Sequence, residues 1–321
     1  IEYKSGSYED FVLSHAAKKL IPIQAEIEII SNCNFHCIHC YVEKRESRID
    51  GTTFYKICDQ LKEMCCVWML ITGGEPLMHP EFFNMLRYAH KKGFELSLFT
   101  NGSLIDYRHI ELFYTLPPET IEVTIYSLDN ESQKAITGRS IDIQAIISKL
   151  TILKEKSNIV LKAILLTQNF AECDSIKELA KTNGFGFRMD AIIHPSLDGN
   201  ISTINYRIQA EKAARLAMSD SISRTQLCNS YQSTKLPFET NGYEFPCSAG
   251  VYSFHIDSNC NLNMCSIYRN KVSDLRIESF QEGWGKLNKL RSSRRSIKTK
   301  CDSCKIKDIC SLCPAIPRLY N

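Results

Sequence analysis

The apolar run Ile27-Glu-Ile-Ile30 is followed almost at once by Cys33-Asn-Phe-His-Cys37-Ile-His-Cys40-Tyr41. An apolar, β-branched run of this length predicts a strand, which would deliver three cysteines to one tight loop. The spacing supplies three thiolates and no fourth. Three thiolates can hold three corners of a 4Fe–4S cube and leave one iron open. An open iron indicates chemistry, because a cluster used only for electron transfer usually has four cysteine ligands.

Chance and zinc are the two alternatives to a cluster at these cysteines. Three cysteines in eight residues can arise by chance in a chain that has fifteen. A zinc ion could bind them with His36 or His39 as the fourth ligand. Structural zinc usually draws its ligands as two pairs from separate segments, so one loop directly after a strand favours a cluster.

A second signal lies in Leu70-Ile-Thr-Gly73-Gly74-Glu75-Pro76. An apolar strand-like run ends there in two glycines, an acid and a proline. Glycines allow backbone N–H and C=O groups to approach a ligand closely, and the Glu75 carboxylate can accept hydrogen bonds from an ammonium group. A Gly-Gly turn alone is often only a bend. One helix and one strand after the cysteine loop, it becomes a strong signal.

Strand-like and helix-like runs alternate along the first 200 residues. The predicted strands are residues 24–30, 67–71, 95–100, 121–127, 160–166 and 186–192, and the predicted helices are 54–64, 80–91, 107–114, 141–154 and 171–181. Such alternation predicts a parallel sheet with outer helices, here an α/β fold with a partial (β/α)6 TIM-like barrel. Barrels of this kind carry their chemistry at the carboxyl ends of the strands, where both motifs fall.

These residues resemble the radical S-adenosylmethionine (SAM) superfamily over residues 24–195. The resemblance implies that Cys33, Cys37 and Cys40 hold a SAM-binding 4Fe–4S cluster, and that Gly73, Gly74, Glu75 and Pro76 contact the SAM amino group. It places His39 and Tyr41 close to the cofactor, His39 near the adenine. It also implies reductive cleavage of SAM to a 5′-deoxyadenosyl radical.

Softer candidates lie at other strand ends. By the same resemblance Thr100, Asn101 and Ser127 touch the ribose or carboxylate of SAM, although such residues are as often turn caps. Arg188 could approach a carboxylate and the Met189 backbone the adenine; the alternatives are a salt bridge and a core methionine. Arg139 is the nearest match to an arginine that related maturases carry after the fourth strand.

The later cysteines are concentrated: Cys228, Cys247, Cys260, Cys265, Cys301, Cys304, Cys310 and Cys313 fall within 86 residues. Eight thiols are the number that two fully ligated 4Fe–4S clusters need, and zinc is the alternative. The segment resembles the SPASM domain of radical SAM peptide maturases. That resemblance assigns Cys247, Cys265 and Cys313 to one auxiliary cluster, and Cys301, Cys304 and Cys310 to the other.

Three features depart from the SPASM pattern: the last spacing is two residues instead of three, the final cysteine is absent, and Cys260 replaces the hairpin glycine. Because a tight turn favours glycine, either Asn259 or Asn261 takes the strained position or the turn is reshaped around Cys260 as a ligand. We expect Cys228 and Cys260 to supply the two missing ligands. Cys228 could instead donate a hydrogen atom to a substrate radical. Cys58, Cys65, Cys66 and Cys173 are predicted to pack in the barrel.

Composition sets the remaining limits. The predicted organisation is an N-terminal helical segment (1–23), the barrel (24–200), a helical bridge (201–240) and a SPASM-like domain (241–321). The net charge of +3 gives no indication of nucleic-acid binding, and the basic run 286–300 is either a solvated helix face or a docking surface for an acidic partner. No apolar run is long enough for a membrane span. Fifteen cysteines without a secretion signal favour metal sites in a reducing cytoplasm. The absence of an initiator Met suggests that upstream residues are missing.

The resulting prediction is a radical SAM peptide maturase. The expected substrate is a precursor peptide that gains a thioether or carbon–carbon crosslink or is epimerised. With about twenty residues before the first strand, leader recognition would be reduced, lie elsewhere or be supplied by a separate leader-binding protein. The cofactors are SAM, its 4Fe–4S cluster and one or two auxiliary 4Fe–4S clusters, two by the cysteine count, with flavodoxin or ferredoxin as reductant. The alternatives are a sulfatase-maturase-like formylglycine-forming enzyme, an RNA-modifying radical SAM enzyme and a non-catalytic iron–sulfur or zinc scaffold.

Overall fold

The strand that leads into the cysteine loop lies inside a nine-stranded sheet with the order β6-β5-β4-β3-β2-β1-β7-β8-β9. The computed structural model describes residues 8–42, 46–219, 224–225, 247–292, 313 and 315–320. The strands are β1 (Gln24–Ile30), β2 (Trp68–Gly73), β3 (Glu95–Thr100), β4 (Thr120–Thr124), β5 (Asn158–Ile164), β6 (Gly186–Asp190), β7 (Ser253–Ile256), β8 (Asn261–Asn263) and β9 (Ser273–Asp274). Strands β1 to β6 pair in parallel with their neighbours.

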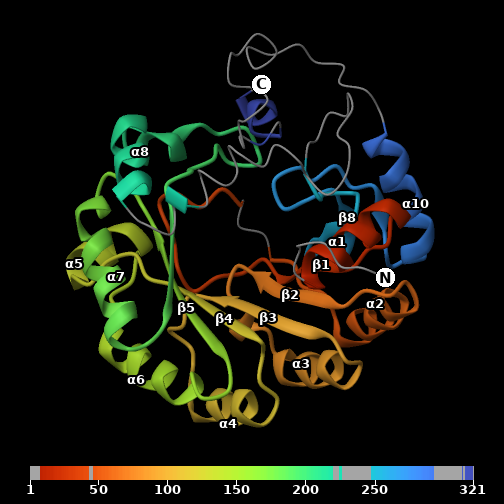
Figure 1. Cartoon of the computed structure of the whole chain (residues 1–321), viewed down its shortest axis with the longest axis horizontal. Coiled ribbons are helices and arrows are strands. Elements are labelled where there is room, and N and C mark those ends of the chain that lie inside the picture. Colours follow the sequence, from red (N-terminus) through yellow and green to blue (C-terminus); the bar gives the residue numbers. More distant parts are fainter. Residues whose placement is uncertain are drawn as a thin grey trace.

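Helices cover the outer side of the curved sheet (Figure 1). The described helices are α1 (Tyr8–Lys19), α2 (Gly51–Glu63), α3 (Phe82–Lys91), α4 (Tyr107–Thr115), α5 (Asn130–Thr137), α6 (Ile143–Leu153), α7 (Cys173–Thr182), α8 (Ala210–Ser219) and α10 (Phe280–Arg291). A helix follows each of the first five strands and returns the chain for the next parallel strand. The partial (β/α)6 barrel is confirmed. The predicted list of helices lacked α5, which lies against the cysteine loop.

Local sequence explains where several helices begin. The Asp50 carboxylate accepts a hydrogen bond from the Thr53 N–H (3.0 Å) and caps α2. Asp106 caps α4 in the same way, and Ser279 and Glu282 form a reciprocal capping box at α10. These side chains satisfy N–H groups that have no partner inside the helix. The starts of the helices, and therefore the lengths of the strand-to-helix loops, are set locally.

The apolar core lies between the sheet and the helices. Ile27 and Ile29 of β1 are fully buried, as are Phe54 of α2 and Phe113 of α4. Burial of one such side chain contributes about 1.5–3 kcal/mol. Because side chains alternate along a strand, Glu26 and Glu28 fall on the inner face of the sheet. That inner face is where the barrel carries polar groups.

Strand β7 extends the barrel sheet. It pairs in parallel with β1, with Gln24 opposite Ser253 and Ile27 opposite Ile256, and β7 and β8 form an antiparallel hairpin. A hairpin in this region was predicted, but its position beside the first barrel strand was not. Residues more than 220 positions apart in the chain thus become neighbours.

Two expectations about single cysteines are corrected by the structure. Cys58, Cys66 and Cys173 are buried as predicted, whereas Cys65 is exposed. Cys65 has a φ of 63° and follows α2 directly, so its side chain leaves the helix on the solvent side. In the hairpin turn neither Asn259 nor Asn261 takes the strained position: Cys260 itself does, with a φ of 62°.

Candidate active site

The loop that carries Cys33, Cys37 and Cys40 is held by backbone contacts to α5. The His36 N–H donates to the Thr137 carbonyl (2.7 Å) and the Ile38 N–H to the Ile136 carbonyl (3.0 Å). Cys33 and Cys37 are partly buried and Cys40 is exposed. Burial raises the pKa of the Cys33 thiol to about 11. A cationic metal centre would oppose that shift, because thiolate ligation releases the proton.

The two glycines of the second motif let the chain pass under this loop. The Gly74 N–H donates to the Ile30 carbonyl (2.8 Å) and the Glu75 N–H to the Asn32 carbonyl (2.9 Å). A Cβ on Gly73 would collide with the Ile30 carbonyl oxygen, and one on Gly74 with those of Ser31 and Asn32. The glycines are thus required by close backbone approach to the residues that precede Cys33.

The Glu75 carboxylate organises the neighbouring strand end. It is fully buried and accepts hydrogen bonds from the Leu77 N–H (3.1 Å), the Thr100 hydroxyl (2.7 Å) and the Asn101 N–H (2.8 Å). Burial raises the pKa of this carboxyl group, while the three donors favour its charged form. Pro76 begins a short 3₁₀ helix and is buried as well. The Glu75 side chain therefore braces β2 against β3.

Asn101 extends that bracing to the cysteine loop. Its side-chain amide donates to the Asn34 side-chain oxygen (2.8 Å) and lies 3.9 Å from the Cys33 sulfur. The Phe35 N–H donates to the same sulfur at 3.3 Å. Such donors stabilise a thiolate. Asn101 and Glu75 thus connect the two sequence motifs in one hydrogen-bonded unit.

A cavity of about 430 Å³ opens where these elements meet. The structure brings Cys33, Cys37, Cys40, His39, Tyr41, Gly73, Gly74, Thr100 and Asn101 to its wall. Gly73, Thr100 and Asp190, at the ends of three parallel strands, line it together, so the cavity lies at the strand edge where barrels carry their chemistry. Glu75 and Pro76 lie behind the wall and support it.

His39 is 8% exposed, and its ring lies 5.2 Å from the Tyr126 ring. Burial lowers the pKa of His39 to about 4, so the ring is neutral at physiological pH. Its Nδ1 atom has no hydrogen-bond partner in the described part of the protein. A neutral aromatic ring with a free polar atom on a cavity wall suits contact with a heteroaromatic ligand.

Three predicted contact residues lie off the cavity. The Ser127 hydroxyl donates to the Glu172 carboxylate (2.7 Å). Arg188 pairs with Glu122 (3.1 Å), and the Met189 sulfur lies 3.9 Å from that of Cys173. Arg139 is also occupied, since its Nε donates to the Asn34 carbonyl (3.2 Å). Each of these side chains therefore has a structural role within the protein.

A charged group on the inner wall was missed. Glu122, Lys162 and Asp190 come from three adjacent strands and line the cavity. The Lys162 ammonium lies 3.9 Å from both the Glu122 and the Asp190 carboxylates. Burial lowers the pKa of Lys162. A lysine in the middle of the apolar strand 158–164 was the available signal, because a charge rarely faces a barrel interior without a role.

The C-terminal cysteines fall into two groups. The first group is Cys247, Cys265 and Cys313. Burial, and to a smaller extent the negative charge of a thiolate at Cys313 or Cys247, raises the pKa of the Cys265 thiol to about 11, so the three sulfurs lie near one another. Cys260 lies elsewhere, 3% exposed in the apolar core and near Asp50 and Asp274. Cys228, Cys301, Cys304, Cys310 and residues 293–300 of the basic run lie outside the described residues.

Within the described residues, no three His, Cys, Asp or Glu side chains converge on a single metal ion. The cysteines of a cubane each bind a different iron, so they need not converge. Three thiols on one loop, with N–H donors at Cys33 and a cavity beside them, fit such a cluster.

Among the described helices none has the length and hydropathy needed to cross a membrane.

The chain is similar to several known proteins. Residues 27–180 match the model of the radical SAM superfamily. The chain is 22% identical to AdoMet-dependent heme synthase of Methanosarcina barkeri, over 90% of each protein. It is 30% identical to the Bacillus subtilis antilisterial bacteriocin subtilosin biosynthesis protein AlbA, over 37% of this chain and 28% of AlbA.

The solved structure of Streptococcus suis SuiB bound to precursor peptide SuiA superimposes with a TM-score of 0.71 and 17% identity, covering 96% of this chain and 77% of SuiB. The chain spans under a third of AlbA, so the comparison does not extend to the whole of that protein. The fold and the strand-end cavity define a partial-barrel enzyme with a cysteine-rich C-terminal region. Residues 27–180 thus form a radical SAM domain, and the fold of the chain is similar to that of radical SAM/SPASM enzymes such as SuiB.

Glu26, on the inner face of the sheet, makes a pH-dependent contribution to the stability of the protein. Burial raises the pKa of Glu26 from 4.5 to about 7. The folded protein therefore binds this proton more tightly than the unfolded chain, so the contribution of Glu26 to stability is greatest below pH 4.5 and falls as the pH rises to about 7. We expect Glu26→Gln, which cannot ionise, to raise the melting temperature at pH 8 and to leave it almost unchanged at pH 4.5.

Thermal unfolding at both pH values checks this, with the exposed acid Glu111 replaced by Gln as the matched control. The expected gain at pH 8 is about 2–4 °C for each kcal/mol recovered. A gain of equal size at both pH values would mean that the effect is not one of ionisation.

Proposed function

We propose that this radical SAM enzyme modifies a peptide. The observation that carries the proposal is that one cavity is lined both by Cys33, Cys37 and Cys40 and by Ser266 and Ile267 of the cysteine-rich region. A substrate in this cavity would contact both regions. Two relatives support a peptide: SuiB was solved with a precursor peptide, and AlbA serves bacteriocin biosynthesis.

In this proposal Cys33, Cys37 and Cys40 ligate a 4Fe–4S cluster, and SAM binds beside it. When bound together, the cluster and SAM would supply radical chemistry, the abstraction of a hydrogen atom from a substrate held in the cavity. Gly73 and Gly74 offer backbone groups to the SAM amino group, and Thr100 and Asn101 offer polar groups at the next strand end. His39 and Tyr41 flank the adenine. Ser127, Arg188 and Met189, which lie off the cavity, would act only through residues that line it.

Cys247, Cys265 and Cys313 are proposed to ligate one auxiliary cluster. Their mutual proximity supports this set, and the Tyr268 and Ala315 N–H groups donate to the sulfurs of Cys265 (3.2 Å) and Cys313 (3.4 Å). Cys301, Cys304, Cys310 and Cys228 are the candidates for further ligands. The electrons would come from a flavodoxin or ferredoxin.

Iron content distinguishes the two groups of cysteines. We expect Cys265→Ala to lose about one cluster's worth of iron and sulfide, since a cluster usually needs its full set of thiolates. Cys260→Gly should keep the wild-type iron content, because Cys260 lies apart from Cys247, Cys265 and Cys313 among the described thiols. The glycine relieves the strain of the positive φ, whereas the loss of a buried side chain lowers stability. Loss of iron in the Cys260→Gly variant would return Cys260 to the ligand set.

A tetrapyrrole is the second candidate substrate. The match to AdoMet-dependent heme synthase extends over 90% of both proteins, further than the match to AlbA. A modified peptide and a modified tetrapyrrole differ in mass, so one analysis of the reaction products distinguishes the two candidate substrates.

The test is anaerobic reduction of the reconstituted enzyme with SAM, followed by measurement of 5′-deoxyadenosine and of the mass of each candidate substrate. We expect 5′-deoxyadenosine from the wild type and none from Cys37→Ala. A mass change in a peptide encoded next to the gene supports the proposal. Turnover of an iron porphyrin without a peptide product would replace it, and absence of 5′-deoxyadenosine would remove the catalytic assignment.

A further inference from the structure

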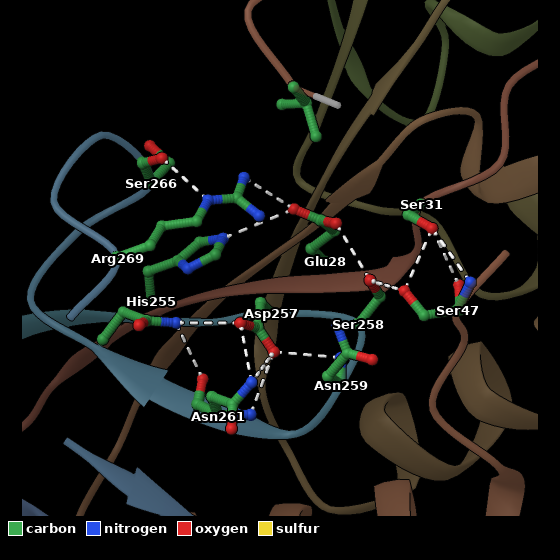
Figure 2. A network of polar contacts seen from close by, with 12 residues as sticks. Glu28, Ser31, Ser47, His255, Asp257, Ser258, Asn259, Asn261, Ser266 and Arg269 are labelled. Carbon is green, nitrogen blue, oxygen red and sulfur yellow. Dashed lines mark hydrogen bonds and ion pairs between the residues drawn. The ribbon is translucent and has the colours of Figure 1, made fainter. Parts of the chain in front are cut away.

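Both ends of the cysteine loop are fastened to each other by a pair of serines (Figure 2). Ser31 precedes Cys33 and Ser47 follows Cys40. The Ser31 N–H donates to the Ser47 carbonyl (2.9 Å), the Ser47 N–H donates to the Ser31 hydroxyl (3.1 Å), and the two hydroxyls are 3.0 Å apart. These contacts close the loop at its base.

The serine pair continues into the β7–β8 hairpin. The Ser47 and Ser258 hydroxyls are 2.7 Å apart, and the Ser258 hydroxyl donates to Oε1 of Glu28 (3.0 Å). Ser258 lies in the hairpin turn and Glu28 in β1. Ser258 is 3% exposed and Glu28 is 4% exposed. A buried chain of hydrogen bonds therefore joins the cysteine loop to a segment more than 200 residues away.

Arg269 extends the network of hydrogen bonds on the other side of Glu28. Its Nη2 atom lies 2.8 Å from Oε2 of Glu28, and its Nε donates to the Ser266 carbonyl (3.0 Å). His255 is also near, 3.8 Å from Glu28, but burial lowers the pKa of its imidazole well below the usual value. Arg269 is thus the charge that neutralises the buried carboxylate, which would be costly to leave unpaired.

The Arg269 end of the hydrogen-bonded network lies next to the candidate active site. Ser266 and Ile267 line the cavity together with Cys33 and Cys37, and Cys265 lies beside Cys247 and Cys313. One network therefore contacts the base of the cysteine loop, the Ser266–Ile267 part of the cavity wall and the segment next to the second group of thiols. No contact of Glu28 or Arg269 with the cavity interior is needed for this arrangement.

We propose that Glu28 and Arg269 are positioning residues that set the separation between the Cys33–Cys40 loop and the Ser266–Ile267 wall, and so the affinity of the cavity for SAM. A fully satisfied buried polar network of this kind makes the segments that it joins rigid, because each member holds the next in place. Removal of one member relaxes both ends. This inference requires that the enzyme binds SAM, and it holds for a peptide or any other substrate.

The experiment compares Glu28→Gln, Arg269→Gln, Ser258→Ala and Ser47→Ala in iron-reconstituted full-length protein. The readouts are the dissociation constant for SAM and the amide hydrogen exchange of residues 46–49, measured in the same samples. We expect each variant to weaken SAM binding about tenfold, as for residues in one network, and to speed exchange at 46–49. Ser47 and Arg269 do not touch, so their effects on SAM affinity would add if they acted independently. Because both act through one network, the effect of the double variant should be clearly less than the sum of the two single effects.

Asp257→Asn is the matched control. Asp257 precedes Ser258 in the same turn, and within the described residues its side chain accepts hydrogen bonds from the hairpin, from Asn259, Asn261 and Asn263. It should lower the melting temperature without changing SAM affinity or exchange at 46–49. Equal effects of Asp257→Asn and Glu28→Gln would overturn the proposal, since hairpin stability alone would then explain both.

Two further results would also overturn it: additive effects of Ser47→Ala and Arg269→Gln, or unchanged SAM affinity in Ser258→Ala, the variant that disturbs the charges least. If the wild type bound no SAM, the assignment of the cofactor would fail, and the exchange of residues 46–49 in the Arg269 variant would still decide whether the two segments are coupled.

Discussion

Gly74→Ala is expected to abolish the formation of 5′-deoxyadenosine and to lower the iron content of the reconstituted protein. The added methyl group would collide with the carbonyl oxygens of Ser31 and Asn32, which are rigid backbone atoms directly before Cys33. The loop must then move by a substantial part of an ångström, and a displacement of about 1 Å can cost about 100-fold in rate. Iron analysis and product chromatography on the same preparation measure both effects.

Gly285→Ala provides the matched control for this change. Gly285 lies inside α10 with no atom within 4 Å of its added Cβ, and alanine is favoured over glycine in a helix by about 1 kcal/mol. This variant should keep wild-type activity and be slightly more stable. Full activity of Gly74→Ala would mean that the loop can shift freely, and the rigid packing described for the site would be wrong.

Glu75→Ala is expected to be the most destabilising single change in the site. It removes the acceptor of three buried donors, from Leu77, Thr100 and Asn101. Each unsatisfied donor costs about 1–3 kcal/mol, so the loss exceeds that of most surface substitutions several times over. The strand end that bears Asn101 would then release its contact with Asn34, and SAM affinity should fall together with the melting temperature.

Glu172→Ala separates stability from site geometry. Glu172, at the end of the short 3₁₀ helix Phe170–Glu172 before α7, is also a carboxylate that accepts from a hydroxyl and an N–H, those of Ser127 and Leu128, but it lies off the cavity. We expect it to lower the melting temperature and leave SAM affinity unchanged. If Glu75→Ala behaved in the same way, Glu75 would be a structural brace without influence on the cofactor cavity.

The strand-end chemistry could be predicted because it depends on short stretches of chain. The cysteine spacing, the Gly-Gly turn and the alternation of strands and helices are all local patterns, and Cys33, Gly74 and Asn101 lie together in the lining of one cavity. The direction in which the Glu75 side chain points could not be predicted from the local sequence. A motif glutamate can face a ligand or the core, and only the donors of β3 decide that it faces the core.

The missed residues share one reason. Lys162, Glu122 and Asp190 belong to three strands that are far apart in sequence, and their proximity follows from the register of β4, β5 and β6. Cys247, Cys265 and Cys313 are also distant in sequence, but the resemblance to SPASM domains indicated their grouping. Single positions in an apolar strand carry little information about which neighbours they will meet.

The sequence by itself determined the class of chemistry, because three thiols on one loop and two glycines at a strand end are needed whatever surrounds them. It also determined the parallel barrel, because βα alternation allows few other arrangements. Tertiary structure alone decided that β7 pairs with β1, and hence that Arg269 meets Glu28 and the hairpin is tied to the cysteine loop. The physical reason is that pairing between distant strands depends on the buried surface and hydrogen bonds of the whole sheet, which no short stretch of the chain contains.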